Sequence, residues 1–448
     1  MADGAALIAQ LDGELRDILS APRLWLAFSG GLDSRVLLSL LIELRTQHRD
    51  FPPLSLLHID HGLHADSTEW ARQCRDIAAQ LGVPCVVERV AVSRRAGGLG
   101  LEAEARQARY RVFESLLGSD ELLLQAHHLD DQCETLMLRL LRGAGLSGLA
   151  AMPRQRELGQ GRLLRPLLNV PRSALLAYAQ QRGLQWLEDP SNADTGFDRN
   201  YLRHTVMPLL AARWPGYRQR LSRSAQNQRD SQALLNDYLD TDLNALLSDK
   251  ALNLTPLRRL DYRRQSALLR RYLERCWGVV LSRAQLDSFR AQFLVSTADA
   301  APEYCAAGWR FYRFKDRLQA EAISLAEQPL PGPQLWSLEA PLQTPQGSLR
   351  AEPGGRFAPR GKVEVGFRRG GERCQLAGES HSRALKKVLQ AYGIAPRRRE
   401  RLPLVYCDGQ LAAIADLAIC EGFVCAPGES GYALHWRDAA AADPLAEL

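Results

Sequence analysis

Two glycines and a carboxylate stand together near the start of the chain, in the segment Ser29, Gly30, Gly31, Leu32, Asp33 and Ser34. Glycine allows close approach of the backbone, and the N–H groups at a helix start attract anions, so this segment predicts a phosphate site. A Walker-type loop would require a lysine followed by serine or threonine, and neither is in place. Asp33 can lie beside phosphates only with a cation between them, so it is a candidate Mg²⁺ ligand. A turn with capping serines is the plainer alternative.

A second cluster combines two histidines and three carboxylates within residues 126–135: His127, His128, Asp130, Asp131 and Glu134. Such a set could hold Mg²⁺, bind an ammonium group or take up a proton. A helix capped by Asp130 or Asp131, with acidic residues in its first turn, would explain part of the pattern without any function. It would not explain the two histidines, so we favour a functional role for the cluster as a whole.

Further candidates lie outside these two clusters: His61, Gly62, Arg106, Arg109, Arg199 and Arg203. His61 and Gly62 follow an apolar run and could line an adenine pocket, whereas His58 within that run could be a satisfied core histidine. Arg106 and Arg109 occupy neighbouring positions of an expected helix, either as a solvated face or as arginines that reach polyphosphate or RNA.

The elements that would position these residues alternate in type along the first half of the chain. Apolar runs at 24–28, 54–60, 83–90 and 121–126 predict strands, and residues 35–44, 67–81, 102–117 and 130–141 predict helices. This alternation predicts an α/β fold with a doubly wound, parallel, Rossmann-like sheet. Ligands of such sheets bind beyond the carboxyl ends of the strands, where the two clusters and His61 all fall.

Length and composition indicate a multidomain globular protein. The 448 residues exceed the usual size of one domain, and 46% are apolar and 24% charged. No segment approaches the roughly 20 apolar residues of a membrane helix, and no secretory signal opens the chain. Nine cysteines without a C-x-x-C pair indicate reduced thiols and a cytoplasmic location.

The second half of the sequence has a different pattern. Residues 217–247 and 257–277 predict long helices, 309–317 alternates like a hairpin strand, and 328–333 is a proline-rich linker before a small mixed α/β domain. We therefore expect domains at 1–215, 216–327 (mostly helical) and 334–436. Residues 368–401 hold ten basic and three acidic residues, which predicts a contact with a nucleic-acid backbone that includes Arg397, Arg398 and Arg399.

Several motifs occur together and in one order: the loop at 29–34, then residues 58–62, 102–110, 126–135, 142–145, 188–192 and 199–203. Together they resemble the tRNA(Ile)-lysidine synthetase family, within the ATP-pyrophosphatase (PP-loop, adenine nucleotide alpha hydrolase-like) group. The resemblance covers residues 24–210 by motif and the remainder by layout.

The resemblance implies a ligase reaction. ATP would adenylate the C2 oxygen of the wobble cytidine of isoleucine tRNA with a CAU anticodon. Free L-lysine would then displace AMP to give lysidine. It further implies that the 29–34 loop holds the triphosphate and that Asp33 and Glu134 handle Mg²⁺. Lysine or tRNA would meet His127, His128, Asp130, Asp131 and Arg203. Arg106 or Arg109, and Arg199, would lie near the nucleotide and target base, and the later domains would grip the tRNA.

Other readings remain. A PP-loop tRNA thiolase would deliver sulfur to an adenylated base, but Cys74, Cys85 and Cys133 lack the paired spacing that this chemistry normally uses. An amidotransferase would need an ammonia source, and nothing in the sequence resembles one. An RNA-binding protein without catalysis would have no need of Asp33, Asp131 and Glu134. The sequence leaves the oligomeric state open.

Overall fold

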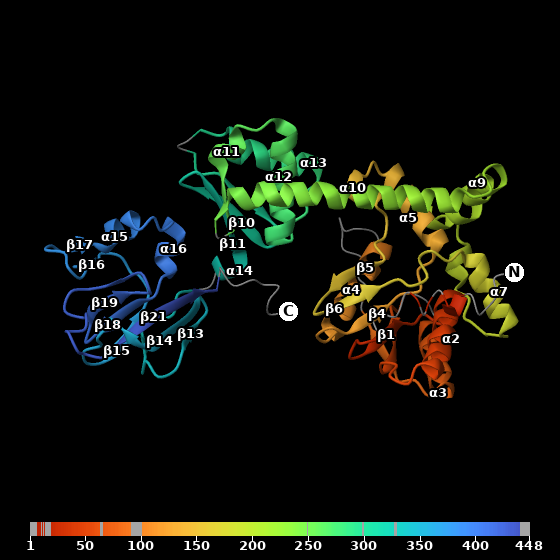
Figure 1. Cartoon of the computed structure of the whole chain (residues 1–448), viewed down its shortest axis with the longest axis horizontal. Helices are drawn as coiled ribbons and strands as arrows, with labels where there is room; N and C mark the ends of the chain where they lie inside the picture. Colours follow the sequence, from red (N-terminus) through yellow and green to blue (C-terminus); the bar gives the residue numbers. More distant parts are fainter. Residues whose placement is uncertain are drawn as a thin grey trace. The chain divides into compact units, whose positions relative to one another are not determined.

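The computed structural model describes residues 7–9, 11, 13, 19–62, 66–90, 101–248, 250–297, 300–326 and 329–439. The chain divides into two compact units, Met1–Leu235 and Asn236–Leu448 (Figure 1). Among the described residues, no helix is long and apolar enough to cross a membrane.

The first unit is built on a six-stranded sheet with the strand order β3-β2-β1-β4-β6-β5. All neighbouring pairs are parallel except β5 and β6, which form an antiparallel hairpin at one edge. The strands are β1 (Leu24–Ala27), β2 (Leu54–Asp60), β3 (Cys85–Arg89), β4 (Leu122–Leu124), β5 (Gln155–Leu158) and β6 (Gly161–Leu164).

Helices pack on both faces of this sheet, with α2 (Leu32–Gln47), α3 (Ser67–Gln80) and α7 (Arg172–Gln181) on one face and α4 (Leu101–Leu116) on the other. Helices α5 (Leu129–Leu141) and α6 (Leu146–Leu149) follow β4 along the chain. Short helical segments follow: η2 (Pro190–Ala193), α8 (Asp198–Tyr201), η3 (Leu202–Val206) and α9 (Met207–Arg213).

Alternation along the strands divides the core of this sheet into two layers. Leu24 and Leu26 pack with α2 and α7 on one face, whereas Trp25 packs with Phe113 of α4 on the other. Side chains on a strand alternate between faces, so an apolar run of this kind is buried on both. The predicted doubly wound α/β sheet is confirmed.

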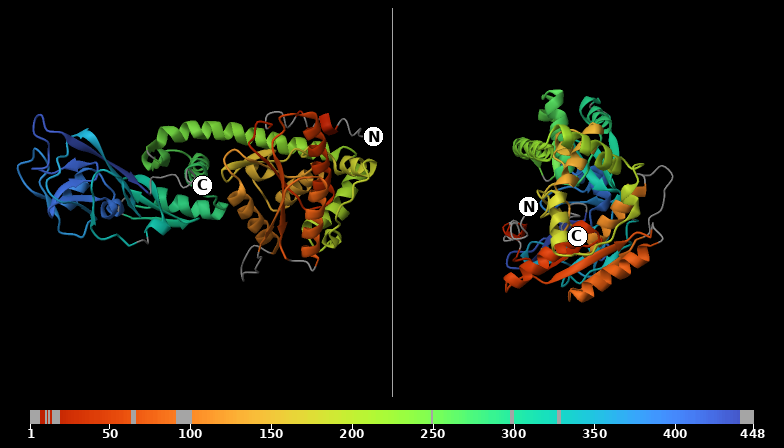
Figure 2. Two further views of the ribbon diagram at one scale, coloured as in Figure 1. Left: turned by 90° about the horizontal axis from the view of Figure 1, so that it is seen from below. Right: turned by 90° about the vertical axis from the view of Figure 1, so that its right-hand side faces the viewer.

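Helix α10 (Tyr217–Leu246) is drawn as one unbroken helix in Figure 2. The elements after it form an antiparallel sheet with the order β7-β8-β11-β10-β9, together with several helices. These elements are β7 (Leu247–Ser248), β8 (Ala251–Asn253), α11 (Leu254–Arg258), α12 (Tyr262–Trp277), α13 (Arg283–Arg290), η4 (Ala291–Val295), β9 (Glu303–Ala306), β10 (Trp309–Phe314), β11 (Arg317–Ala322) and α14 (Ile323–Ala326).

Residues 216–327 are thus mostly helical, with one antiparallel sheet among the helices. The predicted hairpin strand is β10, which pairs with β9 and β11. Its Phe311 is buried in the core beside Phe289, which makes core packing, and not base stacking, the role of that ring.

The remaining elements form the small mixed region that the sequence predicts. A five-stranded sheet has the order β12-β15-β18-β19-β20, beside the sheet β13-β14-β21 and the pair β16-β17. The strands are β12 (Gln334–Leu335), β13 (Leu342–Thr344), β14 (Gly347–Gly355), β15 (Val363–Gly366), β16 (Arg373–Cys374), β17 (Arg383–Ala384), β18 (Leu404–Cys407), β19 (Gln410–Ile414), β20 (Ala418–Ile419) and β21 (Gly431–Asp438), with helices α15 (Leu385–Ala391) and α16 (Pro396–Arg401). The three domain bounds expected from the sequence stay a prediction, since the compact units divide the chain in two.

Candidate active site

The segment 29–34 joins β1 to α2 at the carboxyl end of the central strand. Gly31 caps α2 without a side-chain hydrogen bond, which leaves the first N–H groups of the helix available to an anion. Ser34 donates to the Gly31 carbonyl at 3.0 Å, and the Gly31 N–H donates to Ser29 Oγ at 3.3 Å. The serines therefore hold the loop in shape and do not block the helix start.

Gly30 is required in this loop for two reasons. Its φ of +79° lies in the left-handed region that side chains disfavour. A Cβ atom there would lie 2.6 Å from Leu187 Cδ1 and 3.0 Å from Cys74 Sγ. Leu187 belongs to the polar loop at 187–194, and its N–H donates to the Gly30 carbonyl. The two loops are therefore packed directly against each other.

Asp33, at the second position of α2, has a carboxylate oxygen without a hydrogen bond. Its Oδ1 is buried and unpartnered, with Arg172 Nε at 3.9 Å as its nearest cationic contact. Its Oδ2 lies 3.6 Å from His128 Nε2. A buried oxygen with negative charge and no donor is costly unless a cation completes it, so the chemistry of this position fits a divalent cation.

The helix after β4 is capped by His128, which corrects the expectation that Asp130 or Asp131 would cap it. His128 Nδ1 accepts from the Asp131 N–H at 3.3 Å, and Asp131 Oδ2 accepts from the His128 N–H at 3.0 Å. This reciprocal pair is a capping box in which histidine replaces the usual hydroxyl. Because Nδ1 is an acceptor, the ring proton is on Nε2 and faces Asp33 and Asp131.

The pKa of His128 reflects opposing effects. Burial would lower it, but the contact with Asp33 and the charge of Asp131 raise the pKa above its ordinary value. For Asp131 the directions are reversed. Burial would raise the pKa of this carboxyl, but nearby His128 and Arg199 lower it to about 2. Asp131 is therefore a carboxylate throughout the physiological range.

Two arginines from the basic segment after the 187–194 loop neutralise the carboxylates of α5. Arg199 donates to Glu134 Oε2 at 2.8 Å and to Asp131 Oδ1 at 2.9 Å. Arg203 donates to Glu134 Oε1 at 2.7 Å and to Asp131 Oδ1 at 3.2 Å. Burial would lower the pKa of each arginine, and the two carboxylates raise it above its ordinary value.

This ion cluster bears on the predicted roles of the acidic residues. Both oxygens of the buried Glu134 accept from guanidinium groups, so Glu134 does not lie open to a metal beside Asp33 in this arrangement. Its assignment as a metal ligand stays a prediction. Asp130 accepts from Arg218 and from the Arg172 N–H, and so ties α5 to α10 and α7.

The other predicted nucleotide contact, at the end of β2, contains an unpartnered buried atom. His61 Nδ1 is buried without a hydrogen bond. Burial and the charges of Arg109 and His58 lower the pKa of His61 to about 4, so the ring is neutral. Gly62, with a φ of +60°, donates to Asp60 Oδ1 at 2.9 Å. His58 contacts the Phe28 carbonyl at 2.9 Å and is a satisfied core histidine. The adenine pocket stays a prediction.

His127 lies near Arg106, which the sequence singled out, and near Arg156 and Arg165, which it did not. Its Nδ1 accepts from Arg165 Nε at 3.3 Å, and burial lowers its pKa to about 3. Arg165 lies just after β6 and Arg156 within β5, while Arg106 extends from α4 toward the same tyrosine, Tyr110. The β5–β6 hairpin that carries Arg156 is rich in arginine, and this was the available signal.

Three family models match the chain: a PP-loop domain at residues 6–210, a TilS substrate binding domain at 252–319 and a TilS substrate C-terminal domain at 363–436. The tRNA(Ile)-lysidine synthase of Serratia proteamaculans is 42% identical over 438 residues, which is 96% of this chain and 99% of that protein. The chain belongs to the tRNA(Ile)-lysidine synthase family. Relatives of the same name from Alkalilimnicola ehrlichii and Pseudomonas aeruginosa are each 42% identical, over 90% and 92% of this chain and 91% and 92% of theirs.

Membership of the lysidine synthase family confirms the resemblance that the motifs indicate. The chain is an enzyme that uses ATP and binds tRNA, and it contains a PP-loop domain. The comparisons do not support the alternative of sulfur transfer. The U34-tRNA thiolase NcsA from Methanococcus maripaludis is 16% identical with a TM-score of 0.43, over 50% of this chain and 77% of that one, and a likeness this distant carries no argument.

The predicted RNA-binding arginines lie in the region that matches the lysidine synthase C-terminal model. They do not share one environment. Arg397 pairs with Glu303 and Glu321, Arg398 lies 3.2 Å from Asp438, and the buried Arg399 donates to the Ile394 carbonyl at 2.7 Å. As tRNA contacts they stay a prediction, although Arg399 has the surroundings of a structural residue.

Glu321, near the end of β11, pairs with three arginines among the described residues. Arg310 of β10 lies 3.4 Å away, and Arg397 and Arg401 of α16 lie at 2.9 and 3.8 Å. The carboxylate side chain is only 6% exposed, so these contacts lie out of water. The linker at 328–333 is thus spanned by ion pairs within the second unit.

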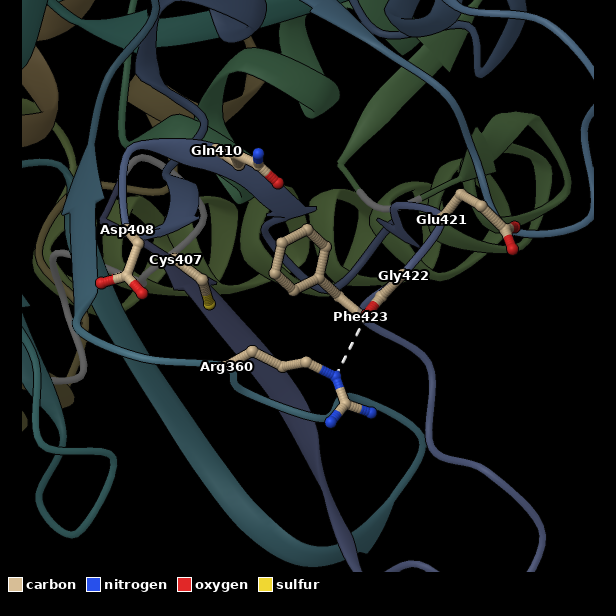
Figure 3. A pocket seen from close by; sticks show the side chains of 7 residues that line it. All are labelled: Arg360, Cys407, Asp408, Gln410, Glu421, Gly422 and Phe423. Atoms are coloured by element: carbon tan, nitrogen blue, oxygen red, sulfur yellow. Dashed lines mark hydrogen bonds between the residues drawn. The ribbon is translucent and has the colours of Figure 1, made fainter.

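A depression of about 310 Å³ also lies in the C-terminal part of this lysidine synthase family member (Figure 3). Its wall consists of Arg360, Cys407, Asp408, Gln410, Glu421, Gly422 and Phe423. Arg360 donates to the Gly422 carbonyl at 3.3 Å and pairs with Glu429. None of the predicted site residues lines it.

Proposed function

We propose that this chain converts the wobble cytidine of CAU-anticodon isoleucine tRNA to lysidine, with free L-lysine as the amine donor. The observation that supports this most directly is the unpartnered Asp33 oxygen beside the uncapped start of α2, in a chain of this family. Together they provide a cation site next to an anion site, as a metal–polyphosphate substrate requires.

The reaction would proceed in two steps. The C2 oxygen of cytidine attacks the α-phosphorus of ATP, and pyrophosphate leaves. The lysine ε-amine then attacks C2, the C2–O bond breaks, and that oxygen departs with AMP. A Mg²⁺ held by Asp33 would offset the charge of the polyphosphate. The N–H groups at the start of α2 would bind and orient phosphate oxygens.

Lysine carries charges that Asp131 and Glu134 could bind. In the present arrangement Arg199 and Arg203 occupy both carboxylates, so the substrate ammonium would have to displace at least one guanidinium. The ammonium must also lose a proton before it attacks. A carboxylate would be its acceptor, because both histidines hold Nδ1 in other hydrogen bonds. We place the reaction in the cytoplasm, where tRNA, ATP and lysine meet.

The test uses purified protein, ATP, Mg²⁺, isotopically labelled lysine and isoleucine tRNA with a CAU anticodon. We expect label in the RNA, AMP and pyrophosphate in equal amounts, and a wobble nucleoside whose mass equals cytidine plus lysine minus water. A matched tRNA with uridine at the wobble position should stay unlabelled. Incorporation of sulfide without lysine would instead support thiolation.

A further inference from the structure

Three arginines converge on one phenol, that of Tyr110 on α4. The guanidinium carbon of Arg106 lies 5.0 Å from the ring centre of Tyr110, and that of Arg156 lies 4.8 Å from it. The Tyr110 hydroxyl lies 3.3 Å from Arg106 Nη2 and 3.4 Å from Arg165 Nη2, and it donates to Gln125 Oε1 at 3.4 Å. Tyr110 therefore organises guanidinium groups from α4, β5 and the end of β6.

Positive charge in this group is not balanced by protein carboxylates. Within the part of the chain that the structure describes, Arg106, Arg156 and Arg165 form no ion pair with Asp or Glu. Arg165 is only 2% exposed, and its partners are the neutral His127, the Pro153 carbonyl and the Tyr110 hydroxyl. A buried guanidinium without a counter-charge is destabilising, and two like charges beside it add repulsion.

The arginines affect one another and the phenol. Burial lowers the pKa of Arg165, and the charges of Arg156 and Arg106 lower it further. Burial would raise the pKa of Tyr110, but the three guanidinium groups lower it. The lowered pKa values of Arg165 and Tyr110 indicate a positive electrostatic potential around the phenol, which would stabilise an anion.

We propose that Arg106, Arg156 and Tyr110, above the buried Arg165, form a subsite for a phosphate group of a substrate. Arg106 is exposed and Arg156 half-exposed, so a ligand can reach both, while Arg165 supplies charge from beneath. Arginine is suited to this role because its planar group binds phosphate oxygens in pairs.

The subsite adjoins the proposed catalytic residues through His127. The His127 ring contacts Arg165 on one side, and its pKa responds to both Arg106 and Arg199. The phosphate could belong to the tRNA backbone near the target nucleotide or to ATP. The geometry favours the tRNA, because the 29–34 loop already provides an anion site for a triphosphate. This inference rests on the proposed function.

The test compares Arg106→Gln and Arg156→Gln with the wild-type protein in binding and in catalysis. We expect each variant to raise the tRNA dissociation constant about tenfold and to lower the slope of log K against log salt by roughly one. The ATP KM should stay unchanged. An ATP phosphate in the subsite would reverse this pattern, with a higher ATP KM and an unchanged tRNA salt slope.

The matched control is Arg111→Gln, an exposed arginine on the same helix that forms no ion pair with a described residue. Arg156→Lys should keep the charge but lose the paired geometry, and so restore the salt slope without full affinity. If both Gln variants bind tRNA and ATP as the Arg111 control does, the subsite is refuted. Failure of the wild-type protein to form lysidine would refute the proposed function instead, which keeps the two failures distinguishable.

Discussion

At the scale of single residues, Asp33 has a buried carboxylate oxygen that accepts no hydrogen bond. We expect Asp33→Asn to lower pyrophosphate release at least about a hundredfold, because the amide keeps the size of the side chain and removes the charge that would hold a cation. The measurement is pyrophosphate release at several Mg²⁺ concentrations. Asp50→Asn, an exposed acidic position after α2, is the control. Wild-type release from the Asp33 variant at low Mg²⁺ would remove Asp33 from the metal site.

Glu134 carries a stability role that can be separated from chemistry. Glu134→Gln leaves Arg199 and Arg203 without one of their two counter-charges, and we expect a loss of about 2 to 4 kcal/mol in the free energy of unfolding. Urea denaturation measures this. Glu69→Gln is the comparison, since Glu69 pairs with Arg72 at the exposed surface and should contribute little. Equal stability of the two variants would contradict the role of the buried cluster.

His127 should make stability depend on pH. Its pKa is about 3 in the folded chain, where burial disfavours the charged ring, against about 6.5 for an unfolded histidine. Between these values the unfolded state binds one more proton, so the free energy of unfolding falls as pH decreases through this window.

We therefore expect His127→Gln to flatten the pH dependence of unfolding between pH 6.5 and about 4. Urea denaturation at several pH values tests this, with the exposed His381→Gln as control. A slope unchanged from wild type in the His127 variant would show that folding does not lower the pKa of this ring.

At the scale of elements, the start of α2 depends on a backbone shape that only glycine adopts easily. We expect Gly30→Ala to weaken ATP binding at least tenfold, because the new methyl group would push Leu187 and Cys74 and distort the loop. Gly82→Ala is a sharp control: its φ is +62°, but nothing lies within 4 Å of the added carbon. That variant should lose about 1 kcal/mol of stability and keep its ATP affinity. Equal ATP affinity in both variants would mean that the loop tolerates the methyl group.

The sequence carried most of the information for the parallel sheet, since its apolar runs are short, buried on both faces and separated by amphipathic helices. It carried less for the antiparallel sheet of the second unit. Strands β7, β8 and β9 have two to four residues each, too short for alternation to be read. The edge strand β5 also lacks an apolar run, because its residues are partly exposed.

Side-chain pairing was the least predictable feature of the site. The sequence indicates His128 as a candidate substrate contact, and the structure shows that it also caps α5. The cap geometry depends on the rotamer and on Asp131 three residues later. Arg199 and Arg203 meet Glu134 only once the chain between residues 141 and 198 has folded back on α5. Spacing along the sequence does not encode a contact over that separation.

At the scale of the whole molecule, the net charge is +6. Basic residues that are exposed and not paired with a carboxylate are the ones available to bind RNA. Lys386 and Lys387 on α15 are exposed, and neither forms an ion pair with a described residue. We expect the double change to Gln to lower the salt slope of tRNA binding by about one and a half. Lys362→Gln, which breaks a surface pair with Glu364, should leave the slope unchanged. An unaltered slope in the double variant would assign α15 to a face away from the RNA.

The arginines around Glu321 also bear on the stability of a truncated form of the protein. A frameshift just beyond the proline-rich segment deletes Arg397 and Arg401. The buried Glu321 of β11 then keeps Arg310 as its remaining partner among these three arginines. Quality-control proteases should clear such a product before it could act on any RNA. Late truncations of the gene should therefore behave as null alleles, even though every residue of the PP-loop domain would still be translated.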